Sequence, residues 1–356
     1  MRDSCAPPAP PRWARARRGV ASRALAPALA LALGAAPGCL CAAPAAPGTD
    51  AADLLGPFII DAGTPPAPVL AVAGETLQMG GMPMRPFGLR VAGALDDDPD
   101  VAGLEILEGL VAYLPTYRHF GVGAVAVGLQ GGYGGTFTAY DAAGALTPEA
   151  QERLTTLLDA TAAQGVAVAV MLFRAGRDGE LADEAAVQAA AAGAAAFVSA
   201  WDHVWVDALD DVDADVPFTH DVLANPARHA EVLGWIRAAA PGLLAVAGTL
   251  GDLESGPGDT AAPLAGSGRP ALVFPHPRLD DYDARGVYSA FEEDRARLDA
   301  GGTFAAGGYF FWHSAWSDHF PPNWYVGGDG SSTVPGLLWL FDDFRTLPFP
   351  MEGGGA

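Results

Sequence analysis

The sequence predicts an α/β protein folded as a (β/α)8 barrel of the TIM type, and three observations support this. From about residue 86, apolar runs of strand length alternate with helical patterns. The strand candidates are apolar throughout, which is typical of a parallel sheet covered on both faces. Successive strands are roughly 40 residues apart over a region of about 265 residues, which suits such a barrel. A doubly wound open sheet is the main alternative.

Seven segments have the composition of buried strands. In order they are FGLRVAG (87–93), VGAVAVGLQ (122–130), VAVAVMLF (166–173), HVWVDAL (203–209), LLAVAGTL (243–250), ALVFPH (271–276) and GYFFWH (308–313). Between the last two, one helix is evident where a full barrel would add a strand and another helix. Either one strand is degenerate or the barrel is incomplete.

Helix signals separate these strands. Thr147 is a candidate N-cap, Pro148 stands at the first helical position, and Gly165 closes the same helix. Asn225 and Pro226 open a second helix. The alanine-rich segments 181–200 and 285–300 are predicted to be helical as well.

The first 45 residues differ from the rest. Arginines precede an apolar run too short to span a bilayer, which is the layout of a secretory signal. The small residues Ala43, Pro44 and Ala45 offer a cleavage site, whereas Cys39 within APGC is a candidate lipid anchor. Both alternatives predict an exported protein, located in the periplasm, at the cell surface or outside the cell. Residues 46–85 form a linker and a short β-hairpin, 86–350 the barrel, and 351–356 a flexible tail.

The charge excludes several functions. The formal net charge is −22, and all 20 basic residues are arginine. Nucleic acid and anionic membrane surfaces are therefore unexpected partners. Without lysine there is neither a P-loop lysine nor a Schiff base. All three cysteines lie within residues 1–45, so the remainder has no disulfide and no thiolate metal site.

The fourth strand candidate ends in carboxylates, in the stretch HVWVDALDD. Strand alternation places Asp207 on the same side as Asp211 and Asp210 on the other, unless the strand has already curled into the loop. Buried carboxylates are costly unless they are paired or poised for proton transfer. A catalytic acid, an ion pair with Arg174 and a contact with a helix N-terminus are all consistent with this pattern.

Other polar and aromatic residues follow the strand candidates, where a barrel places its chemistry. They are Arg90 after the first strand, Gln130 and Tyr133 after the second, Arg174 after the third, Asp252 and Glu254 after the fifth, His276 after the sixth, and Trp312, His313, Trp316 and Trp324 around the last. Flat tryptophan faces stack on sugars, so this set predicts a carbohydrate site. Packing of the barrel top is the alternative role of the tryptophans.

No cofactor or metal is predicted. The glycine-rich stretch GLQGGYGGTF lacks a following helix and a lysine, and is better interpreted as a flexible rim loop. Asp211, Asp213 and Asp215 resemble the start of a calcium loop, but its glycine and glutamate are missing. His313, Asp318 and His319 have no evident fourth ligand.

Over roughly residues 70–345 the chain resembles the cellulase-like glycoside hydrolases, a retaining clan of β/α barrels. GMPMRPFGLRVAG resembles the family's entry into its first strand, HVWVDALDD its fourth strand, and GGYFFWHSAW its last. The resemblance implies that Asp211 stands where the family has its general acid/base glutamate, and that a tryptophan floors the sugar site.

The sequence departs from the family at the nucleophile, a glutamate that ends the seventh strand. If ALVFPH is the sixth strand, His276 matches a histidine the family often has and the seventh strand is lost. If ALVFPH is the seventh, Pro275 and His276 occupy the nucleophile's place. Asp211 paired with Glu254 or Asp252 could instead suit inverting hydrolysis, which needs carboxyls about 6.5–9.5 Å apart.

Three functions remain open. In a hydrolase with a rebuilt site, Asp211 would be the general acid, Glu254 or Asp252 would activate water, His276 and His313 would orient them, and Trp312 and Trp316 would hold the sugar. The second is a catalytically inactive carbohydrate-binding barrel, favoured by the missing nucleophile. The third is a structural surface protein with inward-packed tryptophans.

Overall fold

The structure is a computed structural model, and it describes residues 68–84, 87–97, 106–119, 121–131, 136–210, 216–256, 268–273 and 308–312. All of them belong to one compact unit, Asp50–Ala356. The predicted signal segment 1–45, the tail 351–356 and the predicted helix 285–300 lie outside these ranges.

The main sheet is mostly parallel, and its strand order follows the chain. The strands β4 to β8 are neighbours in sequence order. Their bounds are Phe87–Arg90 (β4), Val122–Gly128 (β5), Ala167–Arg174 (β6), Val204–Asp210 (β7) and Leu244–Ala247 (β8). These five strands match the first five segments predicted from the sequence.

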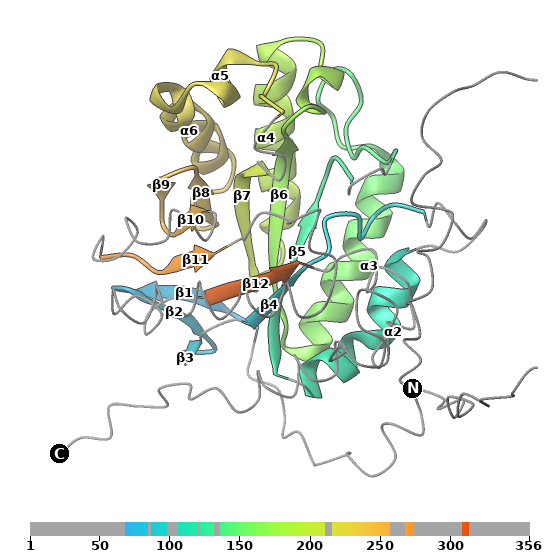
Figure 1. Cartoon of the computed structure of the whole chain (residues 1–356), viewed down its shortest axis with the longest axis vertical. Coiled ribbons are helices and arrows are strands. Elements are labelled where there is room, and N and C mark those ends of the chain that lie inside the picture. Colours follow the sequence, from blue (N-terminus) through green and yellow to red (C-terminus); the bar gives the residue numbers. More distant parts are fainter. Residues whose placement is uncertain are drawn as a thin grey trace, which may run out of the picture. The chain divides into compact units, whose positions relative to one another are not determined.

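The last strand returns to the first. Strand β12, Gly308–Trp312, pairs in parallel with β4, although the two are more than two hundred residues apart in the chain (Figure 1). Strand β11, Ala271–Val273, pairs with β12, and β10, Glu254–Gly256, pairs with β11. This return of the last strand to the first is the arrangement of a barrel.

Strand β10 brings the series of parallel strands in the described ranges to eight. Counted from β4 and leaving out the antiparallel β9, β10 is the sixth, β11 the seventh and β12 the eighth strand. The further strand therefore precedes ALVFPH, whereas the sequence had suggested a gap after it. It was missed because Glu-Ser-Gly is short and polar. ALVFPH thus contains the seventh strand.

In the described residues, backbone hydrogen bonds do not close the main sheet into a complete barrel. The short strand β9, Leu250–Gly251, pairs antiparallel with β8, and no ladder joins β8 to β10 across the described ranges. Strand β10 nevertheless contacts β8. The fold is thus α/β with a curled, mainly parallel sheet.

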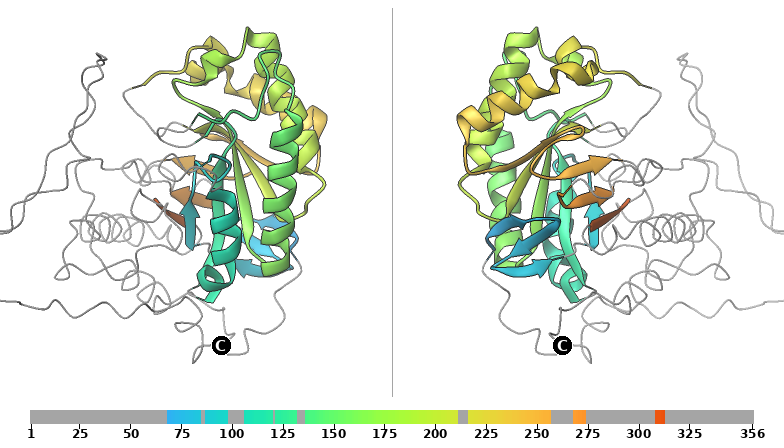
Figure 2. Two further views of the ribbon diagram at one scale, coloured as in Figure 1. Left: turned by 90° about the vertical axis from the view of Figure 1, so that its right-hand side faces the viewer. Right: turned by 90° about the vertical axis from the view of Figure 1, so that its left-hand side faces the viewer.

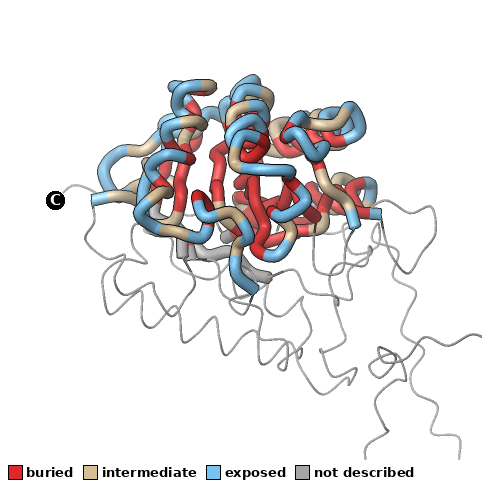
Figure 3. Tube along the Cα trace, turned by 90° about the horizontal axis from the view of Figure 1, so that it is seen from above, coloured by how far each residue is buried: buried red, intermediate tan, exposed pale blue. Residues whose placement is uncertain are grey.

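In the described ranges four main helices pack against one face of this sheet, which favours the barrel over a doubly wound sheet, since that fold carries helices on both faces. They are α2 (Ile106–His119), α3 (Pro148–Gln164), α4 (Glu184–Val198) and α6 (His229–Ala239). Their buried residues join one core with outward-facing valines of β5, β6 and β7. Figure 2 gives this arrangement from two sides, and Figure 3 shows buried strands behind helices with exposed outer sides.

The helix boundaries follow the predicted caps. Thr147 accepts a hydrogen bond from the Ala150 amide at 3.2 Å, and Gly165 ends α3 in the left-handed region at φ 62°. Asn225 caps the 3-10 turn Pro226–Arg228, which leads directly into α6. A short helix, α5 (Asp221–Ala224), precedes this turn. None of the helices in the described ranges is both long and apolar enough to cross a bilayer.

The opposite face of the sheet encloses a second core. Small residues of β5 and β6 meet Trp205 of β7, Val246 of β8 and Leu272 of β11. A three-stranded antiparallel sheet, β1 (Leu70–Ala73), β2 (Thr76–Met79) and β3 (Met82–Met84), contributes Leu77 and Met79 to the same cluster. This apolar filling lies at the amino-terminal halves of the strands, so their carboxyl ends remain for polar residues.

Candidate functional site

Buried polar side chains gather at the carboxyl ends of β4 to β7. Each is at most 8% exposed. They are Arg90, Asp96, Gln130, Arg174, Asp178, Asp207 and Asp210. Burying this many charges is costly unless they are paired, so their contacts define what the region can do.

At the centre is an ion pair between Arg90, which ends β4, and Asp210, which ends β7. The guanidinium donates to Asp210 Oδ1, and both side chains are at most 2% exposed. The pair reaches over β5 and β6 at Gly128, where an added Cβ would lie 3.6 Å from Asp210 Oδ2. Asp210 Oδ2 is buried and has no hydrogen-bond partner among the described residues. Asp210 is therefore a charged acceptor in this pair.

Both aspartates of β7 lie on the face opposite the helices. Val206 and Ala208 belong to the helix-side core, so Asp207 between them faces the interior. Leu209 also packs against the helix-side core, and Asp210 then turns inward to Arg90. Strict alternation had placed Asp207 and Asp210 on opposite sides. The local curl at the strand end, the exception allowed above, brings them to the same side.

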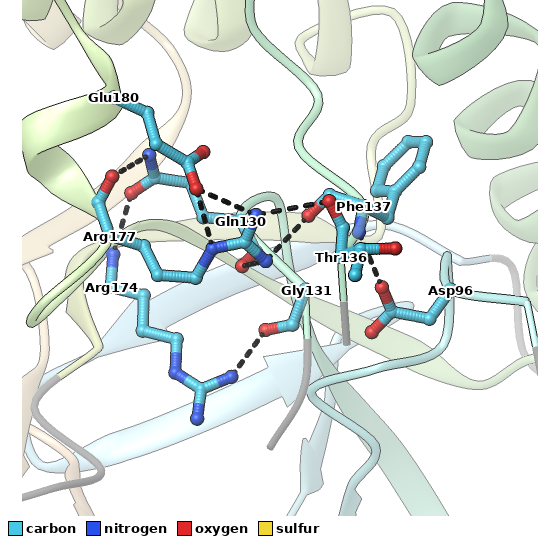
Figure 4. A network of polar contacts seen from close by, with 8 residues as sticks. All are labelled: Asp96, Gln130, Gly131, Thr136, Phe137, Arg174, Arg177 and Glu180. Atoms are coloured by element: carbon cyan, nitrogen blue, oxygen red, sulfur yellow. Dashed lines mark hydrogen bonds and ion pairs between the residues drawn. The ribbon is translucent and has the colours of Figure 1, made fainter. Parts of the chain in front are cut away.

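Gln130 and Arg174 are engaged with the backbone. The Gln130 side chain accepts from the Arg174 amide at 2.9 Å and donates to the Arg177 carbonyl at 3.1 Å. Arg174 Nη1 donates to the Gly131 carbonyl at 3.0 Å (Figure 4). These contacts fix the turn after β6 against the loop after β5. Both residues were predicted to bind substrate. In the structure their side chains make hydrogen bonds that position these two loops.

Arg177 was not among the predicted site residues, and neither were Asp96 and Asp178. Its guanidinium donates to the carbonyls of Gln130, Thr136 and Phe137 at 2.6 to 3.1 Å and pairs with Glu180 (Figure 4). The Phe137 amide in turn donates to Asp96 Oδ1 at 2.9 Å. The loops after β4, β5 and β6 are thereby joined in one network.

Gly131 sits inside this network with φ 73°. A Cβ there would lie 2.7 Å from Arg177 Nη1 and 2.8 Å from the Phe137 carbonyl. Glycine is therefore required at this position by close approach as well as by its backbone angle. The interpretation of GLQGGYGGTF as a flexible loop does not hold at Gly131, although residues 132–135, including Tyr133, lie outside the described ranges.

The structure does not bring Asp252 and Glu254 to this cluster. Asp252 accepts from the Ala245 amide and from Arg237, both at 3.0 Å, beside the first half of β8. Glu254 is the first residue of β10, a strand parallel to β11, so its backbone lies at the amino end. The polar cluster lies at the carboxyl ends. Their proposed partnership with Asp211 therefore lacks support from strand position.

The last strand brings one predicted aromatic position to the cluster. In the parallel ladder Trp312 is the register partner of Arg90, so its backbone lies beside the central ion pair. The remaining predicted residues, Asp211, His276, His313, Trp316 and Trp324, lie outside the described residues. Across the ranges that the structure describes, no group of three histidine, cysteine or acidic side chains is arranged to hold a metal ion.

Comparison with known proteins identifies the fold. No protein-family model matches the chain, and no curated protein sequence matches it. A glycoside hydrolase family 5 protein from Bacteroides vulgatus is similar in structure, with a TM-score of 0.53 and 12% identity over 77% of this chain and 68% of that one. A further glycoside hydrolase has a TM-score of 0.51 and 14% identity over 77% and 71%. The endo-1,4-beta-mannanase from Rhizomucor miehei has a TM-score of 0.50 and 10% identity over 68% and 90%.

These likenesses show the fold, which is that of the cellulase-like glycoside hydrolases, and they confirm the resemblance at this level. The neighbours imply a (β/α)8 barrel, and the strand order described above agrees with it. Because identity is low throughout, they assign no residue a role.

Proposed function

We propose that this chain binds a carbohydrate at the carboxyl ends of its barrel strands and does not hydrolyse it by the retaining mechanism. The observation that carries the proposal is the buried Arg90–Asp210 pair, in which the second Asp210 oxygen has no hydrogen-bond partner among the described residues, with Trp312 as the register partner of Arg90. A charged acceptor next to an aromatic residue is suited to sugar hydroxyls and ring faces.

The position of β11 argues against retaining hydrolysis. As the seventh strand of the series, it is followed directly in the sequence by Phe274, Pro275 and His276, so no glutamate stands at its end. Retaining hydrolysis needs two carboxyls about 5–5.5 Å apart. Asp252 is engaged elsewhere, and Glu254 begins its strand.

Hydrolysis with Asp211 as general acid is the second candidate. Strand β7 ends at Asp210, and Asp211 is the next residue in the sequence. Barrel enzymes take their catalytic groups from residues that follow the strand ends. An inverting reaction would still need a second carboxyl to activate water. We further infer export, with either cleavage near residues 43–45 or a lipid anchor at Cys39, from the sequence of the first 45 residues.

The test is an affinity gel and a reducing-end assay on glucans, mannans, xylans and galactans. We expect retention by one polysaccharide without release of reducing ends. Release that Asp211→Asn abolishes would establish the hydrolase instead. Asp202→Asn is the matched control, because Asp202 is an exposed aspartate just before the amino end of the same strand. If the protein is not retained by any of these polysaccharides and releases no reducing ends, the carbohydrate assignment is overturned and the structural surface protein is favoured.

A further inference from the structure

Two consecutive residues after β6 contact the loops on both sides of them. Arg177 donates to backbone carbonyls of the loop after β5, as described above. Asp178, the first residue of a 3-10 turn (Asp178–Glu180), faces the other way in the series. Its Oδ2 accepts from the amides of Thr219 at 2.7 Å and His220 at 2.8 Å, in the segment that leads from β7 into α5.

The contact made by Asp178 is buried and close. Its side chain is fully buried, so the two amides that donate to Oδ2 offset part of the cost of burying the carboxylate, and Oδ1 has no hydrogen-bond partner among the described residues. At Gly179 an added Cβ would lie 3.1 Å from Thr219 Oγ1, and at Gly176 it would lie 2.5 Å from Val216 Cγ1. The turn after β6 and the segment after β7 therefore lie so close at these two glycines that a larger side chain would force a neighbouring atom to move.

A continuous connection results across four loops. Asp96, after β4, accepts a hydrogen bond from the amide of Phe137, after β5. Arg177, after β6, donates to the carbonyl of the same Phe137. Asp178, also after β6, accepts from the amide of Thr219, after β7. The chemistry of the two central residues is complementary, since the guanidinium satisfies carbonyls and the carboxylate satisfies amides. Neither residue ends a strand or caps a long helix.

We propose that Arg177 and Asp178 are the positioning residues of the carbohydrate site, because together they fix the spacing of the loops that surround the Arg90–Asp210 pair. This inference rests on the proposed function for its ligand, whereas the coupling of the loops does not. The planar guanidinium reaches three carbonyls at once, so lysine does not replace it. Asparagine keeps one acceptor oxygen for the two amides at position 178 and restores part of the contact.

Hydrogen exchange of the full chain tests the coupling. Asp178→Ala is expected to speed exchange about tenfold in a peptide covering 216–224. Arg177→Ala and Arg177→Lys do the same for a peptide covering 136–147, and Asp178→Asn gives an intermediate rate. The matched control is Asp183→Ala, which removes a carboxylate that accepts from the Ala186 amide at 2.9 Å and caps α4 locally. It should leave both loop peptides unchanged.

Retention on the polysaccharide that binds the wild type is measured in parallel, at a temperature where every variant is folded. Asp178→Ala and Arg177→Lys should weaken retention at least about tenfold, while Asp183→Ala and the wild type behave alike. Loosened loops with full retention would overturn the positioning role, and unchanged exchange would overturn the coupling. If no polysaccharide retains the wild type, the proposed function fails, and the exchange data alone decide whether the four loops are coupled.

Discussion

The Arg90–Asp210 pair offers a quantitative test of how the site is built. Removing one partner leaves the other charge buried without its counterion, which costs about 3–5 kcal/mol. Both side chains are at most 2% exposed, so this cost is expected in full. Out of a total stability of roughly 5–15 kcal/mol, that loss lowers the melting temperature by roughly 6–20 °C. Arg90→Met should lie at the upper end, because Arg90 makes at least one interaction besides this ion pair.

The double variant Arg90→Met/Asp210→Leu should recover most of the loss. Replacing a buried ion pair by apolar residues of similar volume is often neutral, so we expect the double variant within about 2 kcal/mol of wild type. Adding the single losses would give about 6–10 kcal/mol, so the coupling should exceed about 4 kcal/mol. Urea denaturation followed by tryptophan fluorescence measures all four proteins. Single variants with wild-type stability, or a double variant equal to the sum, would refute the reasoning.

Three further predictions concern other parts of the fold. Burial lowers the pKa of His203 from 6.5 to about 4, so between these values the unfolded chain binds the proton more readily. The free energy of unfolding is therefore unaffected by this group above about pH 6.5 and falls by about 2 kcal/mol toward pH 4. In urea titrations, the stability of His203→Gln should fall by about 2 kcal/mol less than that of the wild type between pH 7 and 4.5. An equal loss would contradict the assignment. Thr147→Ala removes the N-cap of α3 and should cost about 1 kcal/mol in the same assay, whereas no change would mean the cap is replaced by water. Gly131→Ala should cost at least about 1 kcal/mol more than Gly121→Ala, because both have positive φ but only Gly131 has atoms within contact range of a Cβ; equal costs would show that backbone strain alone acts.

Local patterns predicted the helices α3, α4 and α6 and the long strands, whereas helix α2 was not predicted. Thr147, Pro148 and Gly165 act within one helix, so the sequence contains all the information that places its ends. The apolar runs of β5, β6 and β7 are long enough to be recognised without knowing their neighbours. The resemblance to cellulase-like glycoside hydrolases rested on these same units, and it held at the level of the fold.

Strand β10 and the side-chain directions at the end of β7 were not predictable in this way. Glu254–Gly256 becomes a strand only because β11 offers it a parallel partner. The inward turn of Asp210 depends on Arg90, which is 120 residues away in the chain. Gln130 was assigned to substrate because the sequence shows a polar residue after a strand. The sequence does not show that its side chain bonds to the backbone of Arg174 and Arg177.

The sequence by itself determined the long strands, the helices α3, α4 and α6, and that polar residues follow the strands, because periodicity, capping and composition act over a few residues. The tertiary structure decided which of those polar residues are satisfied by one another. Arg90 with Asp210, Gln130 with Arg174, and Asp252 with Arg237 are all pairs brought together by strand order or packing. A carboxylate acts as a general acid, a hydrogen-bond acceptor or a link between loops according to which groups lie within hydrogen-bonding distance. Those groups come within that distance only when the chain is folded.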